Sequence, residues 1–121
     1  MAQTPEGRVK DAVKKVLSSH GAYYYMPMQN GMGRVGVPDF VACVPTDKGG
    51  LFMGIETKAP GKRQQTTANQ NRELGWIQRA EGVALVVDDA EQLKTALHEL
   101  LGENNAGPTQ ASSIGTKAQR P

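Results

Sequence analysis

Two apolar segments separated by turn-forming residues place the strongest constraint on how this chain can fold. Residues 38–44 and 51–58 are rich in apolar side chains, and the six residues between them include a proline, an aspartate and two glycines. These residue types favour a turn, because proline presets φ and glycine adopts positive φ without strain. The pattern therefore predicts two antiparallel strands that are joined as a β-hairpin.

The residues before this hairpin are expected to form a helix and a short strand. Thr4 is suited to cap a helix over residues 4–19, and Pro5 is suited to its first turn. Apolar side chains recur at helical spacing and predict one buried face: Val9, Ala12, Val13, Val16 and Leu17. Residues 22–28 contain three tyrosines and predict a strand, and a glycine-rich loop is expected at 29–36.

The second half of the chain is expected to add a helix, a strand and a last helix. The pattern of residues 67–81 predicts the first of these helices. Residues 83–87 are wholly apolar, as in a strand that is buried on both faces. This strand can pair in parallel with segment 51–58 through a right-handed crossover. Asp88 or Asp89 is expected to cap the last helix, whose leucines face inward.

The resulting order, αβββαβα, predicts a mixed α/β (α+β) fold with a mixed central sheet flanked by helices. The chain has 121 residues, which fits one domain, here expected at residues 1–101. From Gly102 onward the composition changes to Gly, Asn, Pro, Thr, Ser and Gln. Such a segment has too little apolar surface to form a core, so residues 102–121 are predicted to be a disordered tail.

Composition excludes several kinds of site. Cys43 is the only cysteine, so no internal disulfide can form, and it is expected to be an inert core residue. The two histidines, His20 and His98, are far apart and argue against a histidine-rich metal site. No apolar run is typical of a signal peptide or a membrane span. We therefore expect a cytoplasmic protein, in a bacterial host if the chain is phage-encoded. The net charge of +2 is compatible with a nucleic-acid partner without indicating one.

Two carboxylates and a lysine are expected to converge at one end of the hairpin. Side chains alternate along a strand, so Glu56 and Lys58 point the same way, and Asp39 can lie beside them. Carboxylate oxygens suit Mg²⁺ or Mn²⁺, which can activate water and neutralise charge on a phosphate. This pattern indicates phosphodiester hydrolysis. The alternative is a solvated hairpin face, on which such charges are common.

Two motifs give a specific resemblance. The residues GVPD at 36–39 and IETKAP at 55–60 resemble the PD-(D/E)XK nuclease signature. More narrowly, the chain resembles the VRR-NUC (virus-type replication-repair nuclease) domain, of the stand-alone phage or bacterial type. Further matching residues are Glu6, Met26-Pro27 and Gln70. The resemblance implies that Asp39 and Glu56 bind a divalent metal with the Thr57 backbone carbonyl, and that Lys58 positions or activates water.

The resemblance also assigns Glu6 and Gln70 to the catalytic site, one from each flanking helix. Glu6 lies on the apolar face of its predicted helix, although it could serve only the helix dipole. Gln70 follows Thr67 by three residues, so it could instead form a capping box at the start of its helix.

Basic residues on the loops beside the predicted site are expected to contact DNA. These are Arg34, Lys62 and Arg63, and the alternative is that they are merely solvated. Lys10 lies off the apolar stripe of its helix and is expected on a solvated face. The glycine-rich stretch at 31–36 precedes a strand and not a helix, which argues against a nucleotide cofactor.

The resemblance implies a metal-dependent DNA endonuclease of phage-type replication, recombination or repair. Stand-alone relatives are similar to Holliday-junction resolvases, so we expect a homodimer that cuts junctions, flaps or other branched DNA. One alternative is a catalytically silent, structure-specific DNA-binding module with the same fold. Another is a different hydrolase or a structural protein with a fortuitous motif.

Overall fold

The computed structural model describes residues 3–28 and 33–102, so most of the predicted tail lies outside the described residues. The elements follow the order α1 (Pro5–Ser19), β1 (Tyr23–Tyr25), β2 (Phe40–Thr46), β3 (Gly49–Thr57), α2 (Ala68–Arg79), β4 (Val83–Val87) and α3 (Ala90–Leu101). This is the predicted αβββαβα order, and the mixed α+β class is confirmed.

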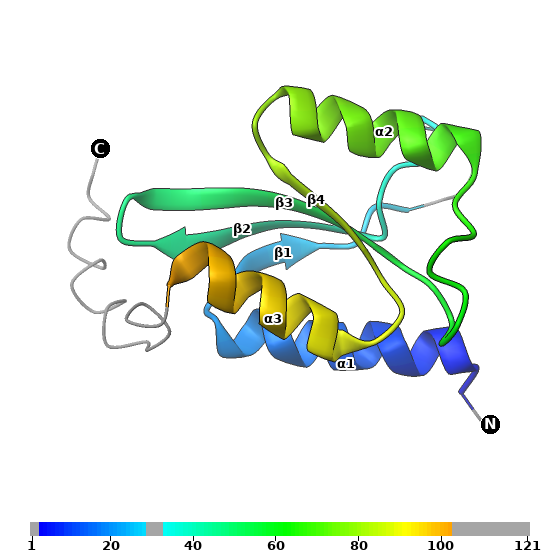
Figure 1. Ribbon diagram of the computed structural model, residues 1–121, viewed down its shortest axis with the longest axis horizontal. Helices are drawn as coiled ribbons and strands as arrows, with labels where there is room; N and C mark the ends of the chain where they lie inside the picture. The colour runs from blue at the N-terminus through cyan, green and yellow to red at the C-terminus, as the bar shows by residue number, and fades with distance from the viewer. Residues whose placement is uncertain (1–2, 29–32, 103–121) are drawn as a thin grey trace.

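The described strands form a four-stranded mixed sheet with the order β1-β2-β3-β4. β1 pairs with β2 and β2 with β3 in antiparallel fashion, whereas β3 and β4 are parallel. α2 makes the crossover between the two parallel strands (Figure 1). The predicted parallel pairing is therefore confirmed.

The sheet lies between two helical layers. α1 and α3 lie side by side below one face, and α2 covers part of the other face (Figure 1). The core fills the space between the sheet and the α1/α3 layer. Its fully buried members are Val13, Leu17, Phe40, Val44, Met53, Ile55, Leu93 and Leu97. Burial of this apolar face is the main force that holds α1 and α3 on the sheet.

The helix ends follow the predicted caps. The Thr4 hydroxyl oxygen accepts a hydrogen bond from the Gly7 amide at 2.9 Å. Thr67 and Gln70 form a complete capping box at the start of α2. Asp89, and not Asp88, caps α3, and its side chain accepts from the Glu91 amide. These caps satisfy amides that a helix leaves unpaired in its first turn.

The hairpin turn is shorter than predicted. The strands continue through Pro45, which pairs with Gly50, and the turn contains only Asp47 and Lys48. Gly50 faces Cys43 so closely that an added Cβ would lie 2.3 Å from its sulfur, which explains why glycine extends the strand here. Pro45 and Gly50 are residue types that favour turns, but here they form part of the paired strands. Contact with the neighbouring strand decides their conformation.

Two expectations about burial were wrong, those for Cys43 and for β4. Cys43 is exposed, because it alternates along β2 with the buried side chains and faces the side of the sheet opposite the core. Tyr23 and Tyr25 are exposed as well, and Tyr24 alone packs against the core. β4 is an edge strand whose first four residues are only half-buried. It remains apolar because α2 packs against one of its faces and α3 against the other.

Among the described residues, no helix is long and apolar enough to cross a membrane.

Candidate functional site

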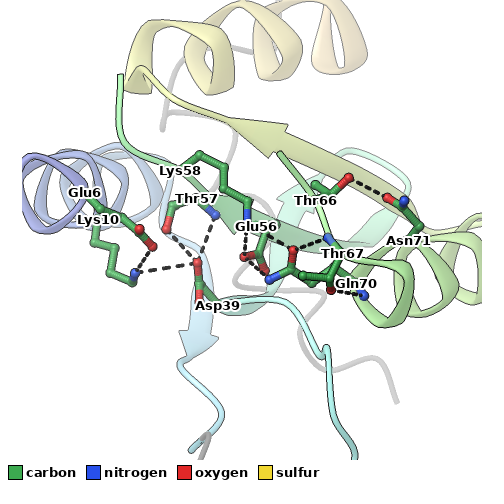
Figure 2. Close-up of polar contacts among 10 residues, drawn as sticks. All are labelled: Glu6, Lys10, Asp39, Glu56, Thr57, Lys58, Thr66, Thr67, Gln70 and Asn71. Atoms are coloured by element: carbon green, nitrogen blue, oxygen red, sulfur yellow. Dashed lines mark hydrogen bonds and ion pairs between the residues drawn. The ribbon is translucent and has the colours of Figure 1, made fainter. Parts of the chain in front are cut away.

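The predicted site residues meet where the hairpin ends, between α1 and α2 (Figure 2). The register pairs Phe40 with Ile55, which sets Asp39 beside Glu56 just before β2 begins. Lys58 follows the last residue of β3, and its amide bonds to the Val87 carbonyl of β4 at 2.9 Å. Hairpin register and parallel pairing therefore position the three motif residues together.

Asp39 is held by its neighbour across the hairpin. Both the backbone amide and the hydroxyl of Thr57 donate to Asp39 Oδ2, at 2.9 and 2.6 Å. Thr57 is fully buried, so these donors have a fixed position. The carboxylate is thereby oriented before any ligand binds.

Glu56 is a buried carboxylate with one unsatisfied oxygen. Only 4% of the residue is exposed, and no described residue makes a hydrogen bond to the buried Oε1. Burial raises the pKa of Glu56 to about 7; the charge of Asp39 adds to the rise, and Lys58 and Lys10 oppose it. An oxygen without a partner in such surroundings is costly unless a proton or a cation satisfies it.

Gln70 connects Glu56 to Lys58. Its Nε2 donates to Glu56 Oε2 at 2.9 Å, while its Oε1 accepts from Lys58 Nζ at 3.0 Å. The same Oε1 accepts from the Thr67 amide at 2.9 Å as part of the capping box. One side chain therefore caps the helix and also contacts both Glu56 and Lys58, two arrangements that the sequence presented as alternatives.

Lys10 brings α1 into the site, and its expected place on a solvated face was wrong. Its Nζ lies 2.7 Å from Glu6 Oε2 and 3.7 Å from Asp39 Oδ2 (Figure 2). Burial lowers the pKa of Lys10, but the Glu6 hydrogen bond and the charges of Asp39, Glu6 and Glu56 outweigh it and raise the pKa above its ordinary value. Glu6 thus contacts the site through Lys10. The signal for Lys10 was its place one helical turn after Glu6.

The donor set suits a metal ion that keeps much of its water. Asp39 and Glu56 offer two carboxylates, and the described residues contain no group of three His, Cys, Asp or Glu side chains that could hold a metal. Mg²⁺ is commonly bound by one or two carboxylates, with water and substrate phosphate completing its shell. The unsatisfied Oε1 of Glu56 is a ready ligand for such a cation.

Comparison with known proteins agrees with this geometry. No family model and no curated protein matches the sequence. A solved structure described as "VRR_NUC domain" is 26% identical, with a TM-score of 0.62, over 80% of this chain and 97% of that chain. The chain has the fold of a VRR-NUC domain. Its fold is therefore that of a nuclease-type, DNA-processing domain, and the similarity extends over nearly the whole of the related domain.

Arg34 in this VRR-NUC domain is bound by a residue that the sequence did not single out. Its Nε and Nη2 donate to the two carboxylate oxygens of Glu73 at 3.0 and 2.9 Å. Glu73 is only 2% exposed, and Arg72 lies 3.7 Å from it on the same helix. Both guanidinium groups lie over the Trp76 ring, at 5.6 and 5.2 Å from its centroid. This cluster fastens the segment before Asp39 to α2.

Lys62 and Arg63 of the VRR-NUC domain lie on the loop that leaves the site after Lys58. Both residues are exposed, and Arg63 Nε donates to the Val86 carbonyl at 3.1 Å. The Gly61 amide donates to Asp88 at 2.9 Å, which ties the loop to the start of α3. DNA contact by Arg34, Lys62 and Arg63 stays a prediction.

Proposed function

We propose that this VRR-NUC domain is a divalent-metal-dependent DNA endonuclease that hydrolyses phosphodiester bonds. The observation that supports this most strongly is that Asp39 lies beside a buried Glu56, whose Oε1 makes no hydrogen bond to any described residue, and next to Lys58. Two carboxylates and an ammonium group at this spacing suit a metal ion and the phosphate that it polarises.

Each residue has a separate task in the proposed reaction. Asp39, Glu56 and the Thr57 carbonyl hold Mg²⁺ or Mn²⁺, which supplies a Lewis acid for the phosphate and lowers the pKa of bound water. Thr57 keeps Asp39 in place through its two hydrogen bonds. The metal satisfies the oxygen of Glu56 that is otherwise unpaired.

Lys58 acts beside the metal. Its ammonium group has three donors. One donates to Gln70, and the group lies 3.7 Å from Glu56 Oε2. A further donor is available to a water molecule or to a phosphate oxygen. Gln70 therefore positions Lys58 and Glu56 relative to each other, and Lys58 positions the water or the scissile phosphate.

The proposed substrate is branched DNA, either a Holliday junction or a flap, in phage-type replication, recombination or repair. This part of the proposal rests on the resemblance of the motifs to stand-alone VRR-NUC nucleases, which also implies a homodimer. Arg34, Lys62 and Arg63 are proposed to contact phosphates, a type of contact that positions a protein on DNA without reading its sequence.

The test is cleavage of labelled four-way junction, flap, nicked and linear duplex DNA with Mg²⁺, Mn²⁺ or EDTA. Asp39→Asn and Lys58→Gln remove a metal ligand and the ammonium group while keeping similar shapes. We expect both variants to lose at least ~100-fold in rate, because metal and proton-handling groups each contribute about that much. Asp47→Asn, in the exposed hairpin turn, is the matched control and should cut normally.

The alternative of a silent binding module predicts a different result. Wild-type protein would then bind branched DNA in EDTA with a clear preference over linear duplex, yet cut none of the four substrates with either metal. That outcome would overturn the proposed endonuclease and favour the binding module.

A further inference from the structure

Among the described residues, Lys10 is the one basic side chain of α1 that forms an ion pair with a carboxylate outside its own helix. Lys14 pairs with Asp11, three residues away on the same helix, and 43% of its side chain is exposed. Lys10 pairs with Glu6 and also lies 3.7 Å from Asp39, and only 27% of its side chain is exposed. A simple surface pair would leave Lys10 in solvent, as Lys14 is.

The packing of α1 on the sheet fixes the direction in which the Lys10 side chain points. Val9 and Val13, on either side of it in the sequence, are buried in the core and hold this part of the helix against the sheet. The helix therefore presents the Lys10 ammonium group to Asp39 from the α1 side, while Gln70 holds Lys58 from the α2 side (Figure 2).

The charges of the cluster are not balanced. Glu6, Asp39 and Glu56 provide three carboxyl groups, and Lys10 and Lys58 provide two amines. A divalent cation between Asp39 and Glu56 would lie within a few ångströms of the Lys10 ammonium group. Like charges repel strongly at such separations where water is partly excluded.

We propose that Lys10 is a resident counter-cation that neutralises Asp39 when no metal is bound and competes with the divalent metal for it. This inference rests on the proposed function, because it requires a metal at Asp39 and Glu56. It makes Lys10 a positioning residue that sets the affinity of the site for metal.

Glu6 has a defined role when the metal replaces Lys10 at Asp39. It is already the nearer partner of Lys10, at 2.7 Å against 3.7 Å for Asp39. When a cation arrives at Asp39, the Lys10 ammonium group can remain paired with Glu6 and move away from the metal. Glu6 thus affects the site by holding Lys10 and need not be a ligand itself.

The test is calorimetric titration of the whole protein with Mn²⁺ in the absence of DNA. Lys10→Gln should bind Mn²⁺ about 10-fold more tightly, the size of effect typical of groups that surround metal ligands. Glu6→Gln should bind it more weakly, because Lys10 then has only Asp39 as a partner. Lys14→Gln removes the same charge from the same helix without touching the site, so it should match the wild type within about 2-fold.

Thermal unfolding in EDTA and in Mn²⁺ is the second measurement. Lys10→Gln should melt at a lower temperature in EDTA, since the carboxylates repel each other, and should gain more from Mn²⁺ than the wild type does. A cooperative transition in EDTA shows that the variant folds.

Unchanged or weaker Mn²⁺ binding in Lys10→Gln would overturn the inference while leaving the proposed function intact. If the wild type and Lys10→Gln both bind no Mn²⁺, the proposed metal site itself fails and the inference fails with it. Equal tightening in Lys14→Gln would show a general effect of net charge and would also overturn the role of Lys10.

Discussion

At the scale of single residues, Gln70 has two separable duties. Its Oε1 accepts from the Thr67 amide at the start of α2 and from Lys58, while its Nε2 donates to Glu56. The Thr67 side chain takes part in the cap, where its hydroxyl oxygen accepts a hydrogen bond from the Gln70 amide at 3.1 Å. The two residues therefore form a matched pair for mutation.

Gln70→Ala should lower both stability and cleavage, whereas Thr67→Ala should lower stability alone. Loss of either capping side chain costs about 1 kcal/mol of unfolding free energy. Loss of the bridge between Glu56 and Lys58 should lower the cleavage rate about 10-fold or more. Urea unfolding and single-turnover cleavage measure the two effects. An equal loss of rate in both variants would contradict a separate site role for Gln70.

The burial of Glu56 predicts a pH-dependent stability in the metal-free protein. The pKa of Glu56 is raised from 4.5 to about 7 in the folded protein. Between these two pH values the folded state therefore keeps a proton on Glu56, whereas the unfolded state has released it. Stability is therefore highest below about pH 4.5 for this group and falls as the pH rises towards about 7. The loss is about 3 kcal/mol at most.

Urea midpoints measured in EDTA at about pH 5 and about pH 7.5 test this prediction. Glu56→Gln cannot titrate and should lose most of the difference between the two midpoints. If the midpoints of the wild type and of Glu56→Gln change by the same amount between these two pH values, the prediction is contradicted.

At the scale of elements, the segment before Asp39 depends on its attachment to α2. Gly36 has φ +92°, and a Cβ there would lie 2.5 Å from the backbone carbon of Asn69. Arg72 adds a hydrogen bond to the Val35 carbonyl at 3.2 Å, and Arg34 binds Glu73. Close backbone approach and paired charges thus hold this segment where it leads into the site.

Gly36→Ala should displace this segment and with it Asp39. We expect a loss of about 2 kcal/mol in unfolding free energy, from the strained φ and the clash together, and a fall in cleavage. Gly33→Ala is the control in the same segment, because a Cβ there meets nothing within 4 Å. Urea unfolding and cleavage assays would contradict the prediction if the two variants behaved alike.

The elements show why sequence patterns predicted the order of the fold better than its details. Helix caps and apolar spacing are local signals, so Thr4, Thr67 and the α3 leucines could be read directly. The length of the hairpin and the edge position of β4 depend on partner strands, which no local pattern encodes. The ion pair between Arg34 and Glu73 joins residues 39 positions apart, so it could not be predicted from one sequence.

At the scale of the whole molecule, one face of the sheet is only partly covered. α2 lies over part of this face (Figure 1). The register places Tyr23, Cys43 and Phe52 in one row across three strands. Tyr23 is 79% exposed and Phe52 46%. Exposed apolar groups that gather on one surface are typical of contact sites. We therefore predict that the proposed homodimer uses this face.

Phe52→Lys should convert the dimer to a monomer in light-scattering measurements of molar mass. A charge placed inside an apolar interface has no partner there and must lose its hydration. Leu100→Lys is the control, since Leu100 is 48% exposed on α3, in the layer on the opposite face of the sheet. A wild-type protein that remains monomeric at high concentration would contradict the predicted dimer.

The shared hydrogen bonds of Gln70 have a consequence for the response of the protein to heat. The first turn of a helix frays more readily than the molecule unfolds as a whole. In this chain each opening of the first turn of α2 would also release Lys58 and Glu56 from each other. Catalytic competence should then decline on warming while the rest of the sheet is still intact. Amide exchange at the start of α2 would track that decline more closely than the global melting curve does.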